Sequence, residues 1–293
     1  MSARSGSHAR AAWRTRTERL LSDRMTTSFS HDSARLAEAY DRLSDSQLEG
    51  GKRLVERMDL RPGERVLDVG CGTGRLARWI AERVAPGGSV VGIDPLADRI
   101  AIARARSPGI SFEVGQAEDL GAFADGSFDA VCMSAVFHWV ADRPKALAEA
   151  RRVLRPGGRL GVTTLPRELM AASSVTAVVG PVLGRSPYAE RVDLSKLAIA
   201  SRGHTTSEIV TMVVESGLQL TELHVVRRTR VHASGRDLVD FLEASSFGNF
   251  MRMVPEEMWP SLRVDLAAAF EASRGPEGVA IADYGMVFVA RRV

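Results

Sequence analysis

The stretch that decides the fold is Arg65–Leu76, which reads RVLDVGCGTGRL. Its apolar run ends at Val69, and glycines then alternate at Gly70, Gly72 and Gly74 before a helical pattern begins. Glycine suits a tight turn that lies close to a ligand because it carries no Cβ. A helix start offers free N–H groups and the positive end of its dipole. The stretch therefore predicts a strand, a ligand-binding turn and a helix.

Strand and helix patterns alternate from residue 64 to residue 166. Apolar runs rich in Val and Ile, typical of strands buried on both faces, lie at 65–69, 89–93, 110–115, 127–133 and 159–165. Helical patterns lie between them at 74–85, 96–107 and 142–154. This alternation predicts a parallel, doubly wound α/β sheet that binds its ligand at the carboxyl ends of the strands.

Composition narrows the class of protein. The chain has 293 residues, of which 45% are hydrophobic and 26% charged, as in ordinary globular proteins. A net charge of +3 does not favour nucleic acid as a partner, and no apolar run is long enough to cross a membrane. Two cysteines provide neither a disulfide framework nor a metal-binding cluster. We therefore expect a cytoplasmic protein with a small-molecule partner and no metal; its oligomeric state, a homo-oligomer included, is left open.

Asp94 is a candidate ligand-binding residue after the second strand. It comes 24 residues after Gly70, about where a βαβ unit places an acid that binds the two hydroxyl groups of a ribose. The alternative role is the N-cap of the next helix, which the following Pro95 supports. We favour ribose binding, because a carboxylate forms strong hydrogen bonds with a vicinal diol.

Two segments carry a family resemblance. VLDVGCGTG resembles motif I of the class I methyltransferases that depend on S-adenosylmethionine (SAM), and RVLRPGGRLGV at 152–162 resembles the helix, turn and fifth strand of that fold. The resemblance implies a Rossmann-like fold with a seven-stranded, mostly parallel sheet, helices on both faces and a helical lid. It implies SAM as the cofactor. The expected contacts at the first two strand ends are Asp68, Gly70, Cys71, Gly72, Gly74, Asp94 and Pro95.

Further cofactor contacts follow from the same resemblance. It assigns the adenine ring to the Gln116 side chain and the Ala117 backbone N–H, and it places Ser134 beside the methionine part of SAM. Related enzymes often have Asp at the position of Gln116, but an amide can form equivalent hydrogen bonds. Tyr40, in the N-terminal helices, is either a lid residue over the cofactor or a surface aromatic on a packing helix.

His138, in the segment AVFHWV, is the candidate catalytic residue. A reference pKa near ~6.5 suits a general base at neutral pH. The alternatives are a packing role beside Phe137 and Trp139, and a reaction that only aligns the acceptor with the methyl group and excludes water. The expected acceptor pocket consists of Phe137, His138, Trp139, Phe247, Phe250 and Met251.

We expect the chain to divide into five segments: a disordered tail at 1–28, a helical cap at 29–63, the SAM-binding core at 64–166, an insertion or lid at 167–204, and a C-terminal part at 205–293 that completes the sheet and carries a helical lid insertion at 235–272. Thr205 and Glu208 are spaced as a capping box for a helix. Arg185, Arg191 and Arg202 are either surface charges or contacts to a carboxylate or phosphate of the acceptor.

We expect a SAM-dependent methyltransferase that acts on a small, hydrophobic or amphipathic metabolite in bacterial biosynthesis. Its layout resembles that of the malonyl-thioester and trans-aconitate enzymes, whereas AVFHWV does not match the corresponding segment of quinone methyltransferases. O-, N- and C-methylation are not distinguished. Two alternatives stay open: a protein of this fold that binds SAM but catalyses another reaction such as a cyclisation, and a non-catalytic SAM-binding regulatory module.

Overall fold

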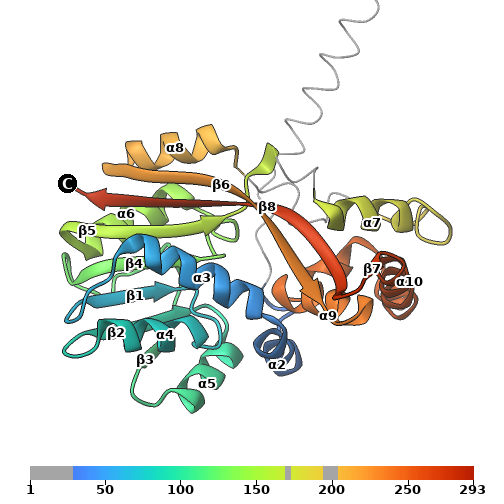
Figure 1. The fold of residues 1–293 in the computed structure, drawn as a ribbon, viewed down its shortest axis with the longest axis horizontal. Coiled ribbons are helices and arrows are strands. Elements are labelled where there is room, and N and C mark those ends of the chain that lie inside the picture. The colour runs from blue at the N-terminus through green and yellow to red at the C-terminus, as the bar shows by residue number, and fades with distance from the viewer. Residues whose placement is uncertain (1–28, 169–172, 194–203) are drawn as a thin grey trace, which may run out of the picture.

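A computed structural model describes residues 29–168, 173–193 and 204–293 of the chain. The expected tail at 1–28, Arg202 and part of the segment 167–204 lie outside the described residues. Figure 1 shows a sheet with helices on both faces and a helical lobe beyond one end of the sheet. Within the described ranges, no helix is long and apolar enough to span a bilayer.

The sheet has the strand order β3-β2-β1-β4-β5-β8-β6. Its parallel strands are β1 (Arg65–Val69), β2 (Ser89–Asp94), β3 (Ser111–Val114), β4 (Phe128–Ser134) and β5 (Leu154–Thr164). β8 (Gly278–Arg292) lies antiparallel between β5 and β6 (Leu218–His232). The predicted Rossmann-like fold is confirmed, and a two-residue β7 (Arg274–Gly275) pairs with the start of β8. The strand order reverses between β1 and β4, which is where doubly wound sheets bind ligands.

One predicted turn lies inside a strand. β5 begins at Leu154 rather than at residue 159, so Pro156, Gly157 and Gly158 belong to it. The register against β4 shifts between the Phe128–Leu154 pair and the Ala130–Arg159 pair. The extra residues form a bulge, which a positive φ of 76° at Gly157 accommodates.

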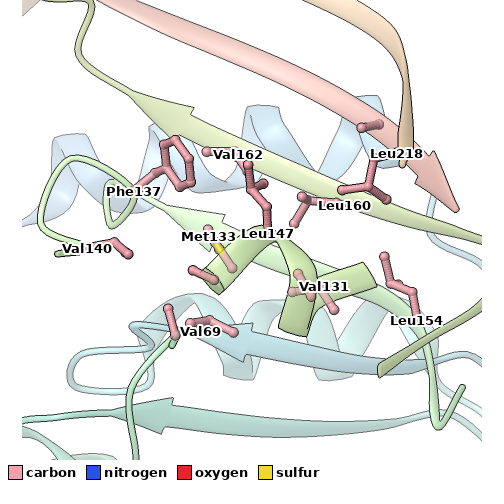
Figure 2. Close-up of a cluster of buried hydrophobic side chains, with 14 of the residues drawn as sticks. Val69, Val131, Met133, Phe137, Val140, Leu147, Leu154, Leu160, Val162 and Leu218 are labelled. Atoms are coloured by element: carbon pink, nitrogen blue, oxygen red, sulfur yellow. The ribbon is translucent and has the colours of Figure 1, made fainter. Parts of the chain in front are cut away.

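Helices cover both faces of the sheet. One face carries α3 (Asp45–Met58), α4 (Arg75–Val84) and α5 (Ala97–Arg106), and the other carries α6 (Arg143–Val153) and α8 (Thr206–Glu215). The predicted capping box of α8 is confirmed, because Thr205 and Glu208 each bond the other's backbone N–H. Figure 2 shows the core between β4, β5 and α6, with Met133, Leu147 and Val162 among its side chains.

The lobe is built on a long two-stranded ribbon. β5 pairs with β8 only up to Thr164 and Met286, whereas β6 and β8 stay paired as far as His232 and Val279. The free half of this ribbon leaves the sheet and carries α7 (Ser174–Leu183), α9 (Gly235–Ser245) and α10 (Trp259–Glu271) (Figure 1). Short 3₁₀ helices, Asn249–Met253 and Glu256–Met258, join α9 to α10. α2 (Ala34–Leu43) packs against α9 beside the sheet.

Candidate cofactor and acceptor site

The glycine turn lies at the carboxyl end of β1, beside β4. Gly70 and Gly72 have positive φ angles of 73° and 55°, which favour glycine. A Cβ on Gly70 would lie 2.2 Å from the side chain of Val136. The N–H groups of Gly70 and Cys71 both donate to the carbonyl of Ile93, at 2.7 and 2.9 Å. The turn is therefore hydrogen-bonded to β2, and it leaves no room for a side chain at position 70.

A pocket of about 400 Å³, counted with its opening to solvent, lies over this turn. Its lining includes Asp68, Gly70, Cys71 and Ser134 from the sheet side and Tyr40 with Leu48 from the N-terminal helices. A Cβ on Gly72 would lie 3.3 Å from the ring of Tyr40. The structure thus brings together these predicted residues, and Tyr40 stands over the turn rather than on an open surface.

Asp68 lines this pocket, and one of its carboxylate oxygens has no hydrogen-bond partner among the described residues. The residue is 1% exposed, and the oxygen without a partner is its Oδ2 atom. Burial, and then the nearby charge of Asp94, raise the pKa of Asp68 to about 7. A buried carboxylate without a partner favours a cationic ligand. The methionine part of SAM carries a sulfonium and an ammonium group, so the residues present fit this cofactor.

Asp94 braces the glycine turn. Its Oδ2 accepts the N–H of Gly72 and its Oδ1 accepts the N–H of Leu96, both at 2.9 Å. Burial raises the pKa of this carboxyl, which is 6% exposed. The predicted N-cap role is not found, because the N-cap of α5 is Leu96 and no side chain caps this helix. Ribose binding by Asp94 and contact by the half-buried Pro95 stay predictions.

The two residues predicted for adenine lie apart from the pocket lining. Gln116 is exposed, and its backbone forms an isolated bridge with Asp119. Ala117 is 4% exposed and packs in the sheet core with Leu120. Neither lines the pocket over the glycine turn, so their contact with a cofactor stays a prediction.

The end of β4 turns sharply beneath the pocket. Ala135 has a positive φ of 59°, and its N–H donates to Oγ1 of Thr163 at 2.7 Å. The hydroxyl oxygen of Ser134 would lie 3.0 Å from a Cβ on Gly51. Because Gly51 has no side chain, α3 crosses close to the strand end and covers Ser134.

His138 follows this turn and is a weak base. Its Nδ1 atom is buried and has no partner among the described residues. Burial, and then the charges of Arg143 and Arg228, lower the pKa of His138 to about 3. The imidazole is therefore neutral at pH 7, and protonating it is unfavourable. This does not fit the pKa near ~6.5 on which the general-base hypothesis relied.

The predicted acceptor residues divide between three places. Phe137 is fully buried in the sheet core (Figure 2), which corrects its assignment to the pocket. Its ring centroid lies 6.2 Å from that of Phe288. Phe250 and Met251, 6% and 0% exposed, pack inside the lobe core instead. Trp139 and Phe247 contact each other at 4.8 Å between ring centroids. Of the predicted acceptor residues, these two rings and His138, which lies beside Trp139, come together.

Arg99 is a site residue that the sequence analysis did not identify. It is 2% exposed, pairs with Asp32 at 3.2 Å and donates to the carbonyl of Ala244 at 2.9 Å. Its guanidinium lies 4.3 and 4.9 Å from the ring centroids of Tyr40 and Phe247. Arg99 of α5 thereby joins the N-terminal segment to the end of α9 and contacts Tyr40, which lines the pocket.

Other arginines separate into anchors and surface charges. Arg75, at the start of α4, donates to the carbonyl of Asp41 at 3.0 Å and pairs with Asp45, which anchors the junction of α2 and α3. Arg185 and Arg191 pair with acids on the lobe surface, and their side chains are 58% and 54% exposed. These last two fit the surface-charge alternative.

The sequence was compared with known proteins. Residues 67–162 match the methyltransferase domain family. The chain is 30% identical over 258 residues to nocamycin O-methyltransferase from Saccharothrix syringae, covering 83% of this chain and 90% of that protein. It is 38% identical over 136 residues to demethylmenaquinone methyltransferase from Symbiobacterium thermophilum, covering 43% and 54%. The solved structure of the cyclase SpnF superposes with a TM-score of 0.52 at 20% identity, covering 84% and 80%.

The strand order and the glycine turn at the β1–β4 boundary define a protein of the Rossmann-like class. The extended match to nocamycin O-methyltransferase narrows this class, and the chain belongs to the class I SAM-dependent methyltransferases. Three other relatives are matched over only 32% to 54% of their own length. The likeness to SpnF concerns the fold alone.

Proposed function

We propose that the protein is an enzyme that transfers the methyl group of SAM to a small, hydrophobic or amphipathic metabolite. The observation that carries the proposal is the buried Oδ2 atom of Asp68, which has no partner among the described residues and belongs to a pocket over a glycine turn. A cationic ligand would relieve the unfavourable burial of this carboxylate. When bound, SAM supplies a methyl group that is already electrophilic.

The residues of the chain have distinct roles in this proposal. Asp68 holds the positively charged methionine part, and Gly70 lets the ligand lie close to the backbone. Tyr40 and Leu48 cover the pocket and exclude water from the reacting atoms. Asp94 fixes the glycine turn and binds the ribose through the lone pairs that its two backbone bonds leave free.

The remaining cofactor contacts complete the proposal. Gln116 and the N–H of Ala117 bind the adenine ring, and Ser134 borders the methyl group at the end of β4. Each is proposed from the position of the residue after its strand. The adenine contacts of Gln116 and Ala117 are separable from the Asp68 contact because they lie at the other end of the cofactor.

The acceptor lies beside His138, Trp139 and Phe247, where the sheet meets the lobe. Because His138 stays neutral at pH 7, it is a poor proton acceptor. Its role in this proposal is to orient the acceptor by a hydrogen bond. Alignment of the two reactants and exclusion of water then supply most of the rate acceleration. Nocamycin O-methyltransferase is named for transfer to oxygen, which supports oxygen as the accepting atom.

Two measurements test this function. Isothermal titration of the protein with SAM should show one binding event that Asp68→Asn weakens and Asp98→Asn, at an exposed position on α5, leaves unchanged. Methyl transfer from labelled SAM to a panel of bacterial metabolites should then identify the acceptor. No heat of binding would refute the proposal. SAM binding without transfer to any acceptor would favour the cyclase or regulatory alternatives.

A further inference from the structure

The free half of the β6–β8 ribbon carries a basic cluster, which we define as Arg228, Arg230 and Asp283. Arg228 lies opposite Asp283 in the ribbon register, and Arg230, two residues further along β6, shares its face. Nε of Arg228 donates to Oδ1 of Asp283 at 3.1 Å, and Arg230 pairs with Oδ2 of the same residue. Two guanidinium groups share one carboxylate, so the cluster keeps an excess of positive charge.

Both arginines have donors that no described residue accepts. Nε of Arg230 is buried without a partner, and the only ion pair of Arg228 in the described residues is the one from its Nε. The two side chains are 32% and 20% exposed, so a ligand can reach Arg228 more readily than Arg230, whose Nε is buried. Arginine cannot lose its proton, so these donors need an acceptor. A planar carboxylate matches the paired N–H groups of a guanidinium.

The basic cluster lies where the sheet gives way to the lobe. β5 ends at Thr164, opposite Met286, and the ribbon continues past this point through Gly285 to Asp283. The charge of Arg228 reaches His138, because it contributes to the lowered pKa of that imidazole. The free half of the ribbon also begins beside the end of β4, because Thr163, which pairs with Val287 of β8, accepts the N–H of Ala135. Figure 1 shows the ribbon passing between sheet and lobe at this level.

The position of Arg228 is fixed by the backbone beneath it. A Cβ on Gly285 would lie 2.5 Å from Cζ of Arg228, so the guanidinium occupies the space that a side chain at 285 would take. Arg230 is held from its other side by Phe241, whose ring centroid lies 5.5 Å from its Cζ. Donors held in place before the ligand arrives lose little conformational freedom on binding.

We propose that Arg228 and Arg230 bind a carboxylate of the methyl acceptor, so that the substrate class is a small amphipathic acid. The inference rests on the proposed function and makes it more specific. The excess charge and the unpaired donors of the basic cluster select the acid, and the rings of Trp139 and Phe247 contact the apolar part. Neutral analogues of the same shape leave the guanidinium donors unmatched, so they bind more weakly.

The test uses matched acid and amide probes on the full chain saturated with S-adenosylhomocysteine. The dissociation constants of octanoate, decanoate, phenylacetate and their amides are measured by isothermal titration. At least one acid should bind more tightly than its amide. Arg228→Gln should weaken that acid by roughly 10- to 100-fold and leave the amide unchanged. Arg228→Lys, which keeps the charge, should restore part of the affinity.

The control is Arg227→Gln, because Arg227 is exposed on the opposite face of the same strand. It should leave every probe unchanged. The inference is overturned if no acid binds more tightly than its amide, or if Arg227→Gln and Arg228→Gln have equal effects. Unchanged binding of S-adenosylhomocysteine in each variant verifies the fold. If this inference fails, SAM still binds. The titration with SAM therefore distinguishes the failure of this inference from the failure of the proposed function.

Discussion

Replacing Asp68 by Asn should stabilise the protein in the absence of SAM. The pKa of Asp68 is about 7 in the fold against an ordinary value of 3.8. The folded state therefore holds this proton more tightly than the unfolded chain, and stability falls as pH rises from about 4 to about 7. At ~1.36 kcal/mol per pH unit, ionising Asp68 costs the folded state about 4 kcal/mol at pH 8 and less than half of that at pH 5.

The free energy of unfolding, measured by urea titration at both pH values, tests this reasoning. The gain from Asp68→Asn should be about 2–3 kcal/mol larger at pH 8 than at pH 5, because the amide does not ionise. Comparing two pH values removes any pH-independent effect of the new side chain. Asp98→Asn, at an exposed site, should show no such difference. An equal effect of Asp68→Asn at the two pH values would refute the conclusion that burial raises the pKa of the Asp68 carboxyl.

Three further outcomes are expected. Gly70→Ala should lower the free energy of unfolding by roughly 2–5 kcal/mol, because Gly70 has a left-handed conformation and a Cβ there would clash. Gly50→Ala should cause no such loss, because a Cβ on Gly50 would have no atom within 4 Å. Equal effects of the two variants in urea titrations would contradict this reasoning. His138→Gln should lower kcat at saturating SAM by less than the ~100-fold expected for a lost general base, and the wild-type pH profile should lack an inflection near ~6.5 that depends on this residue. Arg99→Met should lower the free energy of unfolding by about 3–5 kcal/mol, because it leaves the carboxylate of Asp32 buried and unpaired. Adding Asp32→Asn should recover part of this loss. If nothing is recovered, the loss does not come from the unpaired Asp32.

The sheet was largely predictable because its signals are local. Short runs such as Val66–Val69 are apolar on both faces, and the alternate glycines after them permit only a turn. The same logic failed at Pro156–Gly158, where turn-forming residues are absorbed as a bulge into β5. A sequence pattern does not reveal that difference, because the bulge depends on the register of the neighbouring strand.

The site was predictable only where it follows a strand end. Asp68, Cys71 and Ser134 reach the pocket because parallel strands end at one edge of the sheet. Phe137 and Trp139 are two residues apart, yet one is sealed in the core and the other meets the lobe, since the turn after β4 sets their directions.

The sequence carries no pattern that indicates contacts between distant segments. Arg99 joins Asp32 to Ala244, and on an amphipathic helix it looks like any solvated charge. The basic cluster on β6 was likewise concealed. Its residues alternate along the strand as exposed charges do, and only the pairing with β8 reveals that they share one carboxylate and one face.

The long ribbon has a mechanical consequence. β6 and β8 pass from the sheet into the lobe with only one register shift, between Leu220 and Glu222 at the far end of the sheet. The lobe is therefore the end of a stiff arm whose base is the sheet, and a hinge at their junction would have to break paired backbone bonds. α2 is instead held by side-chain contacts alone, to α9 of the lobe through Leu36 and Ala39 and to α5 through Arg99. Displacing α2 would therefore break only side-chain contacts, whereas displacing the arm would break paired backbone bonds.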